Sequence, residues 1–169
     1  MTKINEKAER KLGVYRDLAA RLEYRNGKLY WRKTLRPSQV GTEAGRPDAL
    51  GYRRIHVYGK GMFAAHRIIF FMHNGWLPEV VDHIDGDCRN NDIANLRAAD
   101  ICQNMRNCKK PITNTSGVKG VYVRSDGKGW TASIRINKKL QHLGSFLTIF
   151  DAACARKSAE NAYYGEFAR

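Results

Sequence analysis

Seven consecutive residues near the middle of the chain place one imidazole among three carboxylates: Val81-Asp82-His83-Ile84-Asp85-Gly86-Asp87. Residues 79–104 hold six acidic residues and two arginines, although the whole chain carries a formal net charge of +14. Histidine titrates near neutral pH and can accept a proton from water, while carboxylate and amide oxygens bind hard divalent cations. A basic chain that gathers acids around one histidine predicts a metal-assisted site facing a polyanion, most simply nucleic acid.

The polar residues that follow indicate how such a site could be assembled. Residues 80–83 and 93–97 read as short strands around a loop rich in turn formers, and Asp100 with Gln103 has the spacing of a helix capping box. This β-β-α unit can bring together Asp82, His83, Asn95 and Asn104. Phosphodiester hydrolysis needs a base for water, neutralised charge on the phosphorus oxygens and a stabilised leaving oxygen. One histidine and one oxygen-liganded Mg²⁺ provide all three.

The same residues resemble the phage-type HNH homing endonucleases, whose catalytic unit is the ββα-metal fold. The resemblance covers residues 30–107 and is carried by Asp82-His83, Asn90-Asn91, Asn95-Leu96-Arg97, Asn104 and the preceding Ala65-His66-Arg67. It implies that His83 is the general base and that Asp82 and Asn104 are metal ligands. It also implies that Asn95 holds the loop and orients the His83 ring.

Asn104 stands where many members of that family have histidine. An amide oxygen in this place favours Mg²⁺, with Mn²⁺ as a substitute, over zinc or nickel. Asp85 and Asp87 are interpreted as turn formers rather than ligands. His66 is interpreted as a packing or hydrogen-bonding residue, with contact to the substrate as the alternative.

Beyond residue 117 the chain has the pattern of a separate module with three strands and one helix. Residues 120–124, 130–137 and 140–146 alternate like strands, and residues 148–151 have capping-box spacing at the start of a helix that we expect to run to about residue 163. We expect its apolar stripe at Phe150, Ala153, Cys154, Lys157 (stem) and Ala162. Strand parity predicts that the helix covers Val121, Val123, Ala132, Ile134 and Ile136, and that Tyr122, Arg124, Thr131, Ser133 and Arg135 are exposed.

This module resembles the AP2 DNA-binding domain, which lays a three-stranded sheet in the major groove and often follows HNH nucleases. The resemblance covers residues 114–168 and is carried by motifs such as Trp130-Thr131-Ala132-Ser133-Ile134 and Leu143-Gly144-Ser145-Phe146. It implies Lys119, Tyr122, Arg124 and Arg135 as DNA contacts, with Ser133 and His142 as weaker ones. Lys128, Lys138 and Lys139 in the turns join them as basic residues.

The predicted fold class is α+β: a ββα-metal nuclease unit followed by the AP2-like sheet and helix. We expect an N-terminal region and nuclease domain over residues 1–108, with the core motif at 80–108, a linker at 109–117, and the DNA-binding domain at 118–169. Further expected elements are helices at residues 5–24 and 62–73, the second ending at Gly75, and a strand at residues 51–58.

No apolar run approaches the ~20 residues that a membrane span needs, so we expect a cytoplasmic protein, encoded by a phage and acting in its bacterial host. The four cysteines form no CxxC pair and are expected to be reduced thiols, with a thiolate metal site as the alternative. The expected partner is double-stranded DNA, bound by a monomer or weak dimer without a small-molecule cofactor. The prediction is a metal-dependent nickase or homing endonuclease; the alternative is a catalytically inactive, sequence-specific DNA-binding regulator.

Overall fold

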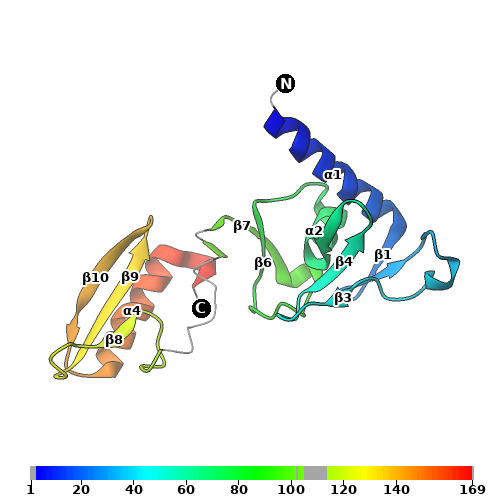
Figure 1. Ribbon diagram of the computed structural model, residues 1–169. Coiled ribbons are helices and arrows are strands. Elements are labelled where there is room, and N and C mark those ends of the chain that lie inside the picture. Colours follow the sequence, from blue (N-terminus) through cyan, green and yellow to red (C-terminus); the bar gives the residue numbers. More distant parts are fainter. Residues whose placement is uncertain (1–2, 102, 105–113, 169) are drawn as a thin grey trace. The chain divides into compact units, whose positions relative to one another are not determined.

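The computed structural model describes residues 3–101, 103–104 and 114–168. It divides into two compact units, Met1–Ala99 and Asp100–Arg169, each described by itself below (Figure 1). Both combine helices with small antiparallel sheets, as a mixed α and β fold requires. No helix in the described ranges is long and apolar enough to cross a membrane.

The first unit begins with helix α1 (Lys3–Arg21), followed by a hairpin of β1 (Leu22–Arg25) and β2 (Lys28–Trp31). The helix predicted for residues 5–24 therefore ends three residues early. Asn26 and Gly27 both have positive φ, 46° and 76°, which is the geometry of a tight hairpin turn. Because this turn pairs Leu22 with Trp31, the last residues of the expected helix belong to a strand.

A three-stranded sheet follows, built from β3 (Arg46–Pro47), β4 (Arg53–Val57) and β5 (Gly61–Ala64), with the 3-10 helix η1 (Pro37–Gln39) in the loop before it. Helix α2 (Ala65–Asn74) leads directly out of β5, so the prediction of a helix from residue 62 was wrong at its start. Residues 62–64 pair with β4 instead, since an apolar run without clear periodicity fits a buried strand as well as a helix. Gly75 ends α2 in the left-handed conformation, as expected.

Helix α2 lies at the centre of the first unit and is buried along most of its length. The hydrophobic core around it includes Tyr15, Leu18, Leu22, Leu29, Ile55, Ile68, Ile69, Val81 and Leu96. Strands β6 (Val80–His83) and β7 (Leu96–Ala99) form a second hairpin against this core, joined by a loop that ends in the 3-10 helix η2 (Ile93–Asn95). Val81 and Leu96 anchor this hairpin in the core, and the hairpin carries the candidate site residues Asp82 and His83.

The second unit contains β8 (Val121–Val123), β9 (Trp130–Ile136) and β10 (Lys139–Phe146) in the order β10-β9-β8, then α4 (Ile149–Tyr164) and the 3-10 helix η3 (Gly165–Phe167). The expected order of three strands and a helix is confirmed. Thr148 caps α4 by accepting a hydrogen bond from the amide of Asp151. Asn137 and Lys138 both have positive φ and form a two-residue turn between β9 and β10.

Two details of the sheet faces differ from the parity prediction. Val123, on edge strand β8, is 52% exposed although parity placed it on the helix-facing side. Ser133 is buried at 7% exposure on the face expected to be open. Of the two weaker candidates for DNA contact, Ser133 is therefore less accessible than His142, which is exposed.

The buried face of α4 was predicted wrongly. Phe150 is 72% exposed, and the residues that face the sheet are Ala152, Arg156, Ala159, Glu160 and Tyr164. Arg156 bonds to Glu160 at 2.9 Å and donates to the carbonyl of Ser133, so its charge and hydrogen-bonding groups are satisfied inside. A pattern of apolar residues could not find this face, because an ion pair occupies part of it.

Candidate active site

Asp82 and His83 are the last two residues of β6, at the end of the β6–β7 hairpin that carries its connecting loop. Asp82 faces Arg97 across the hairpin, and His83 faces Leu96. The guanidinium of Arg97 holds the Asp82 carboxylate with two contacts, 3.0 Å from Nε and 2.9 Å from Nη2. The side chains of this ion pair are only 6% exposed at Asp82 and 13% at Arg97, so the pair is shielded from salt and water.

Asn95 ties together the two ends of the loop between the strands. Its amide nitrogen donates to Asp85 Oδ1 at 2.9 Å and to the carbonyl of Asn90 at 2.8 Å, and its Oδ1 accepts the amide of Asp85 at 3.1 Å. Partial burial acts to raise the pKa of Asp85, but hydrogen bonds from the Asp87 amide, Asn95 and Asn90 outweigh it and lower that pKa. Asp85 is therefore a charged anchor for the loop, the turn-forming role expected from its sequence context.

Asn91 accepts a hydrogen bond from the His83 ring. The distance from His83 Nε2 to Asn91 Oδ1 is 2.9 Å, and both side chains are 5% exposed. An amide oxygen can only accept, so this arrangement puts the proton on Nε2 and leaves the lone pair on Nδ1. Asn91 belongs to the Asn90-Asn91 pair of the motif, but its sequence position alone did not indicate this contact.

Two further rings surround His83. His66, in the first turn of α2, lies 4.9 Å from the His83 ring, and Tyr52 lies 5.6 Å from His66 and 6.1 Å from His83. Burial lowers the pKa of His66 to about 3, and the nearby positive charges of His83, Arg67 and Arg54 add to this effect. His66 is thus uncharged at neutral pH.

The β1–β2 hairpin contacts the loop between β6 and β7 and supports it. The hydroxyl of Tyr24 accepts a hydrogen bond from the amide of Ile93 at 3.2 Å. The turn at Gly27 approaches so closely that a Cβ there would come within 3.0 Å of the Asp92 amide nitrogen. Since Gly27 also has φ +76°, only glycine fits this place without strain.

The predicted second metal ligand lies in the other unit. Asp100 and Gln103 form the expected capping box, with two reciprocal hydrogen bonds of 2.7 Å, and the Asn104 amide donates to the Asp100 carbonyl at 3.0 Å. Because Asn104 belongs to the second unit, its approach to Asp82 stays a prediction. Asn107, Cys102 and Cys108 lie outside the described residues.

Within the described ranges, no three His, Cys, Asp or Glu side chains come together as a metal-binding group. Cys88 and Cys154 are free thiols, as expected.

The predicted DNA-contacting residues share one face of the second unit. Tyr122, Arg124, Arg135, Lys128, Lys138 and Lys139 are exposed, and Lys119 is half-buried. Arg124 pairs with Asp126 at 2.7 Å, and the pKa of Asp126 is lowered by the Lys128 amide and by Arg124. A cavity of about 520 Å³ opens on this face and is lined by Lys119, Tyr122, Arg135 and Lys138, among others.

Comparison with known proteins supports the interpretation of the hairpin and α2. Residues 63–106 match the model of the HNH endonuclease family, a segment that includes His66 as well as His83. Protein 3.8 of Escherichia phage T7 is 32% identical over 98 residues, which cover 57% of this chain and 80% of that protein. No solved structure matches the chain significantly. The chain therefore belongs to the same family as the phage T7 protein and carries an HNH endonuclease domain, the domain of a nuclease acting on DNA.

Proposed function

We propose that this protein is a metal-dependent endonuclease that hydrolyses phosphodiesters of double-stranded DNA. The observation that carries the proposal is His83, a buried imidazole fixed through Nε2 to Asn91 at the end of a hairpin that matches the HNH family. A single motif per chain supports nicking of one strand by a monomer, in a homing or a free-standing phage enzyme. Cleavage of both strands then requires two copies of the chain.

In the proposed reaction, His83 Nδ1 takes a proton from the attacking water. The charge that appears on the ring is stabilised by Asn91 and meets an uncharged His66, whose pKa is about 3. Asp82 and Asn104 are the proposed holders of Mg²⁺ or Mn²⁺, which when bound neutralises charge on the phosphorus oxygens and on the leaving oxygen. The 3′ oxygen leaves, and a 5′ phosphate remains.

Arg97 and Asn95 are proposed to position these groups. The 2.9 Å ion pair with Arg97 fixes the position of the Asp82 carboxylate. The contacts of Asn95 with Asp85 and Asn90 hold the loop that carries Asn91. In this proposal Asn95 therefore orients the His83 ring indirectly, through the loop.

The second unit is proposed to bind the DNA site as an AP2-like reader. Its support is one sheet face where Lys119, Tyr122, Arg124 and Arg135 gather, with Lys128, Lys138 and Lys139 in the turns. Arginine can read guanine edges in the major groove, whereas the lysines bind phosphate. Gel shifts of Arg124→Ala and Arg135→Ala at several salt concentrations test this reader, and unchanged DNA affinity in both variants would contradict it.

The catalytic assignment is tested by incubating supercoiled plasmid with Mg²⁺ and the wild-type chain, His83→Ala or His73→Ala. We expect nicked circles from the wild type and from His73→Ala, because His73 is an exposed residue at the end of α2. His83→Ala should lose at least about 100-fold in rate, as expected for a general base. Nicking that persists in His83→Ala overturns the assignment, and DNA binding without any nicking by the wild type favours the inactive regulator.

A further inference from the structure

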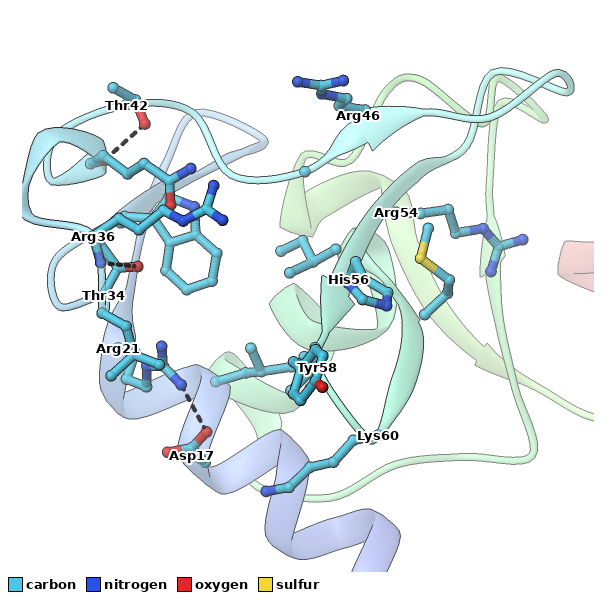
Figure 2. Close-up of a pocket in the computed structure, with 18 of the residues that line it drawn as sticks. Asp17, Arg21, Thr34, Arg36, Thr42, Arg46, Arg54, His56, Tyr58 and Lys60 are labelled. Atoms are coloured by element: carbon cyan, nitrogen blue, oxygen red, sulfur yellow. Dashed lines mark hydrogen bonds and ion pairs between the residues drawn. The ribbon is translucent and has the colours of Figure 1, made fainter.

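The first unit has a groove of about 930 Å³, and none of its lining residues belongs to the hairpin of His83. Figure 2 shows its two sides. Thr34, Arg36 and Thr42 belong to the loop after β2, whereas His56 lies in β4 and Tyr58 and Lys60 lie in the turn after it. The end of α1 closes one end with Asp17 and Arg21. The backbone is closely packed at one side of the groove. Gly45 lies so close to the Arg54 carbonyl that no larger residue fits there.

The lining of this groove has an excess of positive charge. Its two acids are already matched, since Asp17 pairs with Arg21 at 3.2 Å and Glu43 pairs with Arg53 at 3.1 Å. Three exposed cations remain without an ion pair among the described residues: Arg36, Arg46 and Lys60. A concave surface with uncompensated cations attracts a polyanion strongly, because the field is concentrated in the groove.

The same groove also presents apolar groups. Leu18 and Ile55 form a buried floor, at 0% and 1% exposure, while Tyr58 and Leu35 at the rim are both 94% exposed and Met62 is 58% exposed. Exposed apolar side chains gathered at a concavity mark a binding surface. Double-stranded DNA offers phosphates but keeps the faces of its bases stacked, whereas a single strand offers phosphates and base faces together.

We propose that this groove binds a single-stranded segment of DNA. Arg36, Arg46 and Lys60 contact its phosphates, and the ring of Tyr58 stacks on a base. The groove reaches toward the HNH hairpin through Arg54, whose guanidinium lies 5.5 Å from the Tyr52 ring, which in turn lies 6.1 Å from the His83 ring. The use of the groove rests on the proposed nicking function: a strand end freed at His83 unpairs and is held there.

The test measures binding of the full-length chain to a fluorescein-labelled oligothymidylate of 12 nucleotides, in EDTA, by fluorescence anisotropy. The groove variant Arg36→Glu/Arg46→Glu/Lys60→Glu is compared with Lys11→Glu/Arg16→Glu/Lys28→Glu, which has the same net charge but alters exposed residues outside the groove. We expect the groove variant to bind at least tenfold more weakly than the control. Its salt dependence should also fall by about two units of slope, since each lost single-strand phosphate contact removes about 0.7.

Stacking is tested separately at Tyr58, whose 94% exposure makes it dispensable for folding. Tyr58→Ala should weaken oligothymidylate binding about fivefold or more, and Tyr58→Phe should restore it because the ring remains. A duplex of the same length, carrying the same label, is measured in parallel with every variant. We expect the loss in the groove variant to be much larger for the single strand than for the duplex.

The inference is overturned if the groove variant and its control bind oligothymidylate alike, or if single-strand and duplex binding fall equally. Its failure can be told apart from that of the proposed function, since binding is measured in EDTA and nicking on plasmid with Mg²⁺. Normal nicking with no single-strand defect removes only the groove assignment. A single-strand defect together with a wild type that never nicks supports the groove and removes only the catalytic proposal.

Discussion

The rings of His66 and His83 lie 4.9 Å apart, edge to face, and both side chains are buried. Burial is the main cause that brings the pKa of His66 to about 3, and the charge of His83 contributes to it. His66 therefore stays uncharged at neutral pH. An uncharged neighbour suits the general-base role proposed for His83, because a base accepts a proton more readily when no cation lies beside it.

His66 should make the stability of the first unit depend on pH. Its pKa is about 3 in the folded chain and 6.5 when exposed, so the unfolded chain binds the extra proton between these values. The free energy of unfolding should be at its full value above pH 6.5 and fall by up to about 1.4 kcal/mol per pH unit as the pH drops toward 3.

This dependence can be measured by urea unfolding at several pH values in a Trp130→Phe background, where Trp31 and Trp76 report on the first unit. His66→Phe keeps a ring in the same place and should remove the contribution of His66 to the slope. If the two chains lose stability equally as the pH falls, burial of an uncharged His66 is not its source.

Asn91 should tune the base through the hydrogen bond of 2.9 Å to His83 Nε2. Asn91→Ala should lower the nicking rate about 10- to 100-fold, because the ring loses its fixed orientation. In Asn91→Asp a carboxylate replaces the amide, and because an opposite charge favours a protonated ring, the acid limb of the pH–rate profile should move to higher pH. A pH profile unchanged in Asn91→Asp would contradict this contact, whereas a merely structural role would change only the rate.

The buried pair of Asp82 and Arg97 should separate stability from activity. Arg97→Met removes the partner of a carboxylate that is 6% exposed and should destabilise the first unit by about 3 kcal/mol or more. Asp82→Asn keeps a hydrogen-bond acceptor for Arg97 and should be milder in urea unfolding, yet abolish nicking. Exposed Arg89→Met is the control and should cost less than about 0.5 kcal/mol. Equal destabilisation by Arg97→Met and Arg89→Met would contradict the prediction.

Two glycines of the second unit offer a matched comparison. Gly120 and Gly127 have φ of +78° and +70°, but a Cβ at Gly120 would meet the Ser133 carbonyl and the Arg156 guanidinium, whereas one at Gly127 would meet nothing within 4 Å. Gly127→Ala should cost only the backbone strain, about 1 kcal/mol, and Gly120→Ala at least about 2 kcal/mol more. Urea unfolding followed by Trp130 fluorescence, with Trp31 and Trp76 replaced by Phe, measures both; similar costs would mean that the Arg156 contact is loose.

Local chemistry made much of the fold predictable. Turn formers and caps act on neighbouring residues, so the strand at Val80–His83, the Asp100–Gln103 capping box and the Thr148 cap all follow from their own sequences. Residues 62–64 were misassigned because an apolar run next to a helix can equally pair as a strand, here with β4, which immediately precedes it in the chain. The buried face of α4 was misassigned because Arg156 on that face is stabilised by Glu160 and by a carbonyl of β9, which a pattern of apolar residues does not reveal.

The site shows the same division between local and distant information. The motif drew attention to His83, Asp82 and Asn95, and these residues lie together on one hairpin and its loop. The surroundings of His83 come from elsewhere in the chain: Tyr52 precedes β4 and His66 begins α2. The family resemblance included His66 but not its contact with His83, and nothing in the sequence indicated Tyr52, because these contacts depend on how the elements pack around the hairpin.

The brace between the first hairpin and the site loop sets a limit on how this nuclease unit can be reused. Tyr24 holds the amide of Ile93, and Gly27 lies against Asp92, about 65 residues further along the chain. A transplant of residues 63–106 alone, the span that matches the family, would leave behind the support of its own catalytic loop. The smallest portable module of this protein therefore starts no later than β1, and protein engineers who fuse it to other DNA readers must carry the N-terminal hairpin with it.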